Sequence, residues 1–196
     1  MNHIARPPKT TQAAEGFPRR PFTTDDLRRM VEVGIIGRDE RIELIGGELK
    51  PMAAKGARHE MLKIALNQFW AKRTPDNYRL APETGLYLAN DTYVEPDFIF
   101  YPREVRWADL RGHNISLLVE VAETSLAYDR GLKASIYARF GVREMWVIDA
   151  GKLLTHIHRD PVDGEYKTIP EADKNALLTP LGLPELGVRL GELELF

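Results

Sequence analysis

Two short segments of the sequence are apolar on both faces of the strand they would form, and each contains one carboxylate. They are VEPDFIFY, residues 94–101, which contains Asp97, and SLLVEVA, residues 116–122, which contains Glu120. A strand that is apolar on both faces belongs inside a sheet covered on both sides. An ionised carboxylate in that position must be paired, hydrogen-bonded or bound to a cation. The two acids therefore predict a buried polar site between neighbouring central strands.

Helical patterns surround these two segments. Apolar residues recur at helical spacing in residues 59–73, and a second helix is predicted from Tyr128 to Phe140. Thr23 or Thr24 is predicted to cap a short peripheral helix. The inward face of the second helix is expected to carry Leu132, Ile136, Tyr137 and Phe140.

Extended patterns supply the other predicted elements. Residues 41–53 are expected to form a tight β-hairpin around two adjacent glycines, and strands are predicted within 78–90, 144–150 and 153–159. His156 and His158 alternate along the last of these strands and are interpreted as surface residues of a hairpin. Helices and strands in this order predict an α+β or mixed α/β fold.

Composition limits the class of protein. The chain has 196 residues, of which 43% are hydrophobic, and this is enough for one domain with its own core. There is no cysteine, so a metal ion would need oxygen or imidazole ligands. No apolar stretch is long enough to cross a membrane, which predicts a soluble, cytoplasmic protein. Residues 1–21 are expected to be a flexible arm, and residues 22–196 a single domain.

The second predicted helix brings a cation to the two acids. Lys133 precedes Ile136 by three residues, so it stands at the edge of the inward face. A helix that directly follows strand 116–122 packs back on the sheet, and Lys133 is therefore expected to reach Glu120. Asp129, one turn earlier, is expected to hold Lys133 in place. The alternative for each residue is a solvated strand end or a surface lysine paired with Asp129.

A series of motifs in a fixed order links the chain to a known family: FTTDDLRRM, RIELIGGEL, RHE, the PD of VEPDFIF, VEVAETS and YDRGLKASIYARFGVREMWVID. With these motifs, most of residues 22–196 resembles the Uma2-like proteins, which are assigned to the restriction endonucleases of the PD-(D/E)XK nuclease superfamily. The resemblance implies a restriction-endonuclease-like core, in which helices flank a central mixed β-sheet, with an N-terminal helix and β-hairpin.

The resemblance also implies roles for individual residues. Asp97 corresponds to the metal-binding aspartate of PD, and Glu120 to the acid of the second motif. The superfamily's lysine normally stands two residues after that acid, where this chain has Ala122, and Lys133 on the following helix takes its place.

Two more residues, Glu43 and His59, match recurrent positions of the family. His59 is expected to line the site; the alternative is a structural histidine at the end of a helix, near its first turn. Glu43 alternates with apolar neighbours, so without the resemblance it is interpreted as an exposed strand residue.

Hard oxygen ligands from Asp97, Glu120 and the main-chain carbonyl of Val121 would suit Mg²⁺ or Mn²⁺. The implied activity is cleavage of DNA, and cutting both strands would favour a homodimer. The first alternative is a catalytically inert nuclease-fold binding or assembly module, which the pI near 6.2 and the missing lysine at position 122 favour. A glycoside hydrolase with two carboxylates is a weaker alternative, since Trp107 is the only tryptophan expected on a loop.

Overall fold

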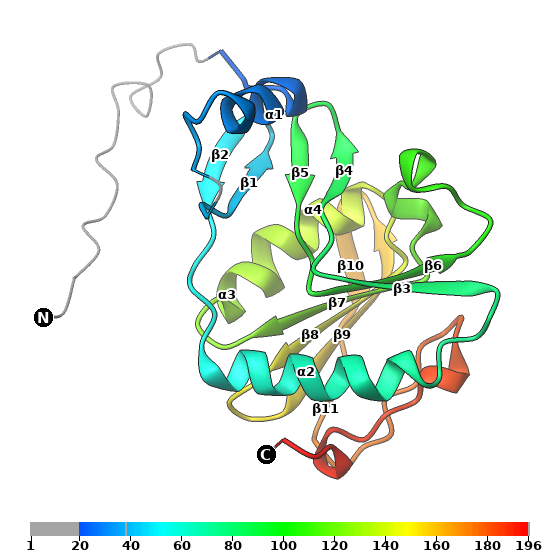
Figure 1. Ribbon diagram of the computed structural model, residues 1–196. Helices are drawn as coiled ribbons and strands as arrows, with labels where there is room; N and C mark the ends of the chain where they lie inside the picture. The colour runs from blue at the N-terminus through cyan, green and yellow to red at the C-terminus, as the bar shows by residue number, and fades with distance from the viewer. Residues whose placement is uncertain (1–19, 38, 196) are drawn as a thin grey trace, which may run out of the picture.

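The structure consists of two β-sheets, with helices on both faces of the larger one (Figure 1). It is a computed structural model that describes residues 20–37 and 39–195. The predicted flexible arm, residues 1–21, lies outside the described residues except for its last two positions. Among the described residues, no helix combines the length and the apolar composition needed to cross a membrane.

The larger sheet is mixed and has seven strands in the order β10-β9-β8-β7-β6-β3, with β11 paired to β9. β7 and β8 are parallel, whereas the other pairs are antiparallel. The strands are β3 (Tyr78–Pro82), β6 (Phe98–Pro102), β7 (Leu117–Ala122), β8 (Glu144–Asp149), β9 (Leu154–Val162), β10 (Glu165–Thr168) and β11 (Glu171–Ala172). This sheet confirms the predicted mixed α/β class and places segment 116–122 at its centre.

The smaller sheet has four antiparallel strands in the order β2-β1-β5-β4 and stands beside one end of the larger sheet (Figure 1). Its strands are β1 (Ile42–Ile45), β2 (Glu48–Pro51), β4 (Leu86–Ala89) and β5 (Thr92–Val94). The predicted hairpin is β1-β2, and positive φ angles of 56° and 80° at Gly46 and Gly47 form its turn. The helix α1 (Thr24–Glu32) begins with a capping box between Thr23 and Asp26, as the sequence predicts.

Each face of the larger sheet has its own apolar core, covered by one helical segment. On one face, the long helix α2 (Ala57–Ala71) packs Leu66 and Trp70 against Phe98 and Trp146. The other face is covered by a continuous helical segment between β7 and β8 (Figure 1). It consists of α3 (Leu126–Tyr128), a π-helical turn η4 (Asp129–Lys133) and α4 (Ala134–Arg139). Four short 3₁₀ segments complete the helical elements of the described residues: η2 (Trp107–Asp109), η3 (Gly112–Asn114), η5 (Pro184–Leu186) and η6 (Leu190–Glu192).

Two details of the predicted elements are wrong. Segment 94–101 is not one strand: Val94 ends β5 in the smaller sheet and Phe98 begins β6 in the larger one, with Asp97 between them. Pro96 has no N–H to donate to a ladder, which favours a break at this point. Leu132 is 53% exposed rather than inward-facing, because the π-helical turn shifts the phase of the residues within it.

The interpretation of His156 and His158 as surface residues is also wrong, since both are buried. They lie on β9, an internal strand that pairs with β8 along one edge and with β10 and β11 along the other. His158 packs its ring against Tyr166, at 5.5 Å between ring centroids. His156 Nδ1 lies 3.0 Å from an Oε1 atom of Glu171. Burial lowers the pKa of both histidines and so favours their neutral forms.

Candidate active site

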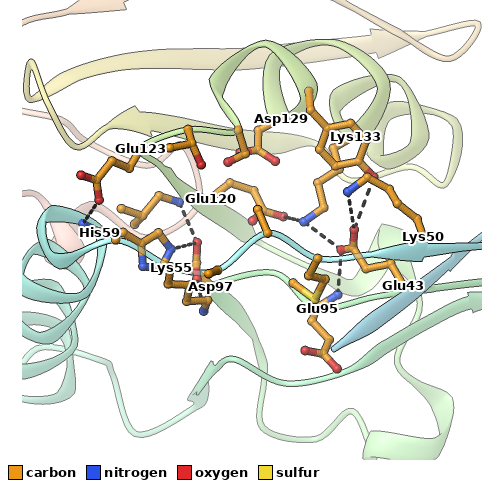
Figure 2. A pocket seen from close by; sticks show the side chains of 18 residues that line it. Glu43, Lys50, Lys55, His59, Glu95, Asp97, Glu120, Glu123, Asp129 and Lys133 are labelled. Carbon is orange, nitrogen blue, oxygen red and sulfur yellow. Dashed lines mark hydrogen bonds and ion pairs between the residues drawn. The ribbon is translucent and has the colours of Figure 1, made fainter. Parts of the chain in front are cut away.

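A pocket of about 80 Å³ lies where β6 and β7 separate, beside the smaller sheet (Figure 2). The last residue pair between the two strands is Phe98 with Val119. Beyond this pair β7 continues to Ala122, still paired with β8, so that its other edge faces the pocket. All the residues that the sequence analysis assigned to the site line this pocket: Glu43, His59, Asp97, Glu120, Val121, Asp129 and Lys133.

Asp97 takes the place of the missing strand partner. Its Oδ2 accepts a hydrogen bond from the main-chain N–H of Val121 at 2.8 Å, and a second from His59 Nε2 at 3.1 Å. The carbonyl of a strand residue points to the same side as its N–H, so the carbonyl of Val121 is also on the Asp97 side of β7. The other oxygen, Oδ1, accepts from Lys55 Nζ at 3.0 Å.

Glu120 and Lys133 meet as the sequence predicts. Lys133 Nζ lies 2.9 Å from Glu120 Oε1, and the Tyr137 hydroxyl donates to the same oxygen at 2.7 Å. All three side chains are buried. The helical segment that follows β7 packs back on the sheet, and this brings the lysine and the tyrosine over the strand that carries Glu120.

Glu43 completes the surroundings of Lys133, which lies 2.9 Å from Glu43 Oε1. The interpretation of Glu43 as an exposed residue is wrong: it is 1% exposed and contacts Lys133 and Tyr128 of the helical segment that covers the larger sheet. Glu43 also accepts a hydrogen bond from the main-chain N–H of Glu95 and one from the Tyr128 hydroxyl, both at 3.3 Å. A glutamate of the smaller sheet therefore fixes a lysine of the helical segment that covers the larger sheet.

His59 and Asp129 line the pocket in different ways. His59 is buried on the first turn of α2 and is oriented by Glu60, 3.2 Å from Nδ1, while Nε2 contacts Asp97. Asp129 does not hold Lys133: its carboxylate accepts a hydrogen bond from the Ser125 hydroxyl, and the two ion pairs of Lys133 are those to Glu43 and Glu120.

The sequence analysis missed three residues of the site. Lys55 precedes α2 in a loop without periodicity, so no pattern indicated its position. Tyr137 was predicted to be an apolar core residue, and its hydroxyl reaches Glu120. Glu123 accepts a hydrogen bond from the main-chain N–H of His59 at 3.1 Å and so caps α2 from across the pocket. A carboxylate directly after the SLLVEVA strand was the available signal for Glu123.

Burial and neighbouring charges shift the two central acids in opposite directions. Burial alone would raise the pKa of Asp97. The pKa is nevertheless lowered to about 2, because Asp97 is hydrogen-bonded to His59, lies near the charges of His59 and Lys55, and accepts a hydrogen bond from the Val121 N–H. Burial raises the pKa of Glu120 to about 8, against the opposing charge of Lys133. The other carboxylates near Glu120 act in the same direction as burial; they belong to Asp129, Asp97 and Glu43.

The pocket has an excess of negative groups. Among the described residues that line it, six carry carboxylates and three are lysines. Burial disfavours the charged form of Lys133, yet the Glu120 and Glu43 carboxylates raise the pKa of Lys133 above its usual value. An additional cation near Glu120 would relieve the repulsion between the acids.

The donor atoms fit a hard divalent cation that keeps part of its water shell. Asp97, Glu120 and the Val121 carbonyl offer oxygen, and Mg²⁺ is commonly held by one or two carboxylates and water. Within residues 20–37 and 39–195, no three His, Asp or Glu side chains form a group arranged to hold a metal ion. The fit therefore depends on two acids and a main-chain oxygen rather than on a cage of acidic side chains.

Comparison with known proteins gives matches in sequence and in fold. The model of the Uma2 family, described as "Putative restriction endonuclease", matches residues 24–191. No curated protein matches the sequence. The crystal structure of a "putative nuclease belonging to DUF820" from Anabaena variabilis ATCC 29413 superposes with a TM-score of 0.64. The two chains are 15% identical, and the match covers 88% of this chain and 97% of the other.

A second solved structure, the type IIG restriction endonuclease BpuSI, matches with a TM-score of 0.39 and 18% identity. That match covers 60% of this chain and 14% of BpuSI. The TM-score of 0.64 to the Anabaena structure shows that the two chains share a fold. Since the family model spans most of the sequence, the chain belongs to the Uma2 family of restriction-endonuclease-like nucleases.

Proposed function

We propose that this protein is a metal-dependent endonuclease that hydrolyses phosphodiester bonds of DNA in the pocket between β6 and β7. The observation that carries this proposal is the convergence of Asp97, Glu120 and Lys133, which come from three separate parts of the chain, in one pocket. The Uma2 family assignment supports the same reaction class. Two acids and a lysine around an open position suit the hydrolysis of a phosphate ester.

Asp97 and Glu120, with the carbonyl of Val121, would hold Mg²⁺ or Mn²⁺. When bound, the cation would polarise the phosphate and lower the pKa of a water molecule in its shell. The protein prepares Asp97 for this role by keeping it ionised, since His59 and the Val121 N–H donate to its Oδ2. Glu120 must lose its proton to bind the cation, and the nearby Lys133 ammonium stabilises the ionised form.

Lys133 is the proposed catalytic cation. Its contacts with Glu43 and Glu120 fix the ammonium at the pocket wall and leave little freedom to the side chain, which is 4% exposed. A preorganised ammonium can stabilise the charge that develops on a phosphate during hydrolysis. Glu43 positions Lys133, and His59 positions Asp97. Asp129 lines the pocket and adds negative charge near Glu120.

One observation favours the inert module as a second candidate. Lys55 and Lys133 already neutralise Asp97 and Glu120 in the structure, and such ion pairs would also stabilise a fold without any catalysis. The two candidates differ in a direct way. A module of this kind cleaves nothing, whether its acids hold a structural cation or only a buried hydrogen-bond network.

The proposed substrate is DNA, with products that carry a 5′-phosphate and a 3′-hydroxyl. We further propose that residues 22–196 act as a single domain in the cytoplasm. A homodimer would let two such pockets act on the two strands of a duplex.

The test is incubation of the purified protein with supercoiled plasmid, linear duplex and single-stranded DNA, each with Mg²⁺, Mn²⁺ or EDTA. Nicked or linear products with Mg²⁺ or Mn²⁺, and none with EDTA, would support the proposal. Asp97→Asn and Glu120→Gln should each abolish cleavage, whereas Glu165→Gln, an acid far from the pocket on β10, should cleave like the wild type. Failure of the wild type to cut any substrate with either metal would contradict it and favour the inert module.

A further inference from the structure

Among the described residues, Lys55 is the one that contacts Oδ1 of Asp97. Its Nζ is 3.0 Å from Asp97 Oδ1, whereas His59 and the Val121 N–H both bind Oδ2 (Figure 2). Oδ1 is therefore the oxygen that a divalent cation would take. A cation that bound there would come close to the Lys55 ammonium, and the two positive charges would repel each other.

Glu83 positions the Lys55 side chain from a strained backbone conformation. Its carboxylate forms ion pairs with both Lys55 and Lys63, and its main-chain N–H donates to the carbonyl of Asp97 at 2.9 Å. Glu83 has a positive φ of 45°, in the left-handed region that residues other than glycine rarely adopt. Strain of this kind persists where the surroundings enforce it, and it is common at functional sites.

Gly56 fixes the main chain next to Lys55. A Cβ atom at position 56 would lie 2.2 Å from Glu123 Oε2, so a larger residue would displace this carboxylate from the start of α2. The same carboxylate caps α2 through the N–H of His59. The backbone of Lys55 is thus held against the pocket, while its long side chain keeps its own rotatable bonds.

Lys55 and Lys133 differ in how tightly they are enclosed. The Lys55 side chain is 16% exposed and comes from the loop between β2 and α2, at the mouth of the pocket. The Lys133 side chain is 4% exposed and lies between two buried glutamates. Of these two ammonium groups, Lys55 is the one that can move without leaving a buried carboxylate unpaired, because part of the Asp97 charge is still balanced by hydrogen bonds to Oδ2.

We infer that Lys55 is an exchangeable cation: it neutralises Asp97 until a divalent metal ion takes Oδ1, and it then binds the phosphate backbone of the DNA. This inference rests on the proposed function and assigns a role to a residue that the metal site itself does not require. A flexible lysine at the pocket mouth suits contact with a phosphate, to which it presents a point charge. Metal binding and DNA binding are then coupled through one side chain.

The exchange predicts opposite effects of one substitution on two affinities. Lys55→Met removes the competing charge but keeps much of the side-chain volume. Mn²⁺, titrated calorimetrically into the DNA-free protein, should bind about tenfold more tightly, as expected when one opposing partly buried charge is removed. A fluorescent duplex, titrated by anisotropy with Ca²⁺ in place of Mg²⁺, should bind about tenfold more weakly, because one phosphate contact is lost.

Lys63→Met is the matched control, since Lys63 pairs with the same oxygen of Glu83 but has no ion pair with Asp97. It should leave both affinities within about twofold of the wild type. Lys55→Arg keeps the charge and should leave Mn²⁺ affinity near that of the wild type. Circular dichroism and urea unfolding of each variant show whether the fold is retained.

A Lys55→Met protein that binds Mn²⁺ and DNA as the wild type does would overturn the inference, and so would one that loses affinity for both. The second result would make the Lys55 contact a purely structural ion pair. If the wild-type protein cleaves DNA with metal, neither of these results for Lys55→Met affects the proposed function. A wild-type protein that neither binds Mn²⁺ nor cleaves DNA would instead remove the proposed function, and the inference with it.

Discussion

Lys133 Nζ lies 2.9 Å from Glu43 Oε1, and this buried ion pair joins the helical segment on the larger sheet to strand β1 of the smaller one. The same ammonium contacts Glu120, so a single side chain connects two sheets and the proposed metal ligand. The smaller sheet is therefore part of the site and not an appendage. Substitutions on either side of this contact should affect stability and activity together.

Lys133→Met should lower the free energy of unfolding by about 3–5 kcal/mol, because it leaves two buried glutamates without their cation. Urea unfolding followed by circular dichroism measures this loss. Val121→Ala, which shortens a buried side chain in the same pocket wall without removing a charge, is the control for simple loss of packing. A loss below 1 kcal/mol for Lys133→Met would mean that the lysine does not stabilise the fold through these pairs.

The catalytic role of Lys133 has its own test. Lys133→Ala should nearly abolish plasmid cleavage while it leaves Mn²⁺ binding mostly intact, because Asp97, Glu120 and the Val121 carbonyl remain. Calorimetric titration with Mn²⁺ and a cleavage time course on the same preparation give both quantities. If metal affinity falls as far as activity does, Lys133 acts by maintaining the metal site rather than by stabilising charge on the phosphate.

Metal binding should depend on pH through Glu120. Because burial raises the pKa of this group from 4.5 to about 8, its contribution to stability is present below pH 4.5 and is lost as the pH rises through 8. A divalent cation stabilises the ionised form and reverses that loss. The increase in thermal unfolding temperature caused by Mg²⁺ should therefore be larger at pH 9 than at pH 6. Glu120→Gln should remove the difference, and an equal increase at both pH values in the wild type would contradict the assignment.

Asp97 should make the stability of the protein fall as the pH is lowered, the opposite of the effect of Glu120. Its pKa is lowered from 3.8 to about 2 in the folded protein, chiefly by His59 acting against burial. Asp97 therefore contributes about 2 kcal/mol to the free energy of unfolding above pH 3.8, and this contribution is lost as the pH falls towards 2. Urea unfolding between pH 2 and pH 5 should show a smaller change for Asp97→Asn than for the wild type. Parallel curves for the two proteins would show that Asp97 is not linked to acid unfolding.

A glycine of the π-helical turn offers a way to stabilise the protein without touching the pocket. A Cβ atom at Gly131 would have no heavy atom within 4 Å among its surroundings, so Gly131→Ala should raise the free energy of unfolding by about 0.5–1 kcal/mol and leave cleavage unchanged. Gly112→Ala is the matched control, because its Cβ would lie 2.2 Å from the carbonyl oxygen of Phe140. Gly112→Ala should destabilise the protein, and equal stabilities of the two variants would contradict the packing described for them.

The meeting of Glu120 and Lys133 could be predicted from the sequence because each belongs to an element with a strong periodic signal, whereas Asp97 was placed by its apolar neighbours although it lies between β5 and β6. Residues 116–122 are apolar on both faces of the strand, and this pattern placed Glu120 in a central strand. The helix that directly follows this strand could only pack back on the same sheet. Residue types at fixed spacing were sufficient for this part of the site.

Other parts of the site depend on tertiary structure that no local pattern encodes. Glu43 looked exposed, since its burial comes from the packing of one sheet against a helical segment of the other. Lys55 lies in a loop, where no periodicity indicates the direction of a side chain. Leu132 was misplaced because a π-helical turn has no clear sequence signature, and the two-sheet arrangement was hidden because β5 and β6 follow each other with only three residues between them.

The most direct test of the central claim is a crystal structure of the protein soaked with Mn²⁺, with the anomalous signal used to locate the metal. We predict one peak in the pocket, about 2.1 Å from carboxylate oxygens of both Asp97 and Glu120, with Lys133 still paired to Glu43. A peak elsewhere on the molecule, or an unchanged pocket without any peak at saturating Mn²⁺, would contradict the assignment of this pocket as the metal site of a nuclease.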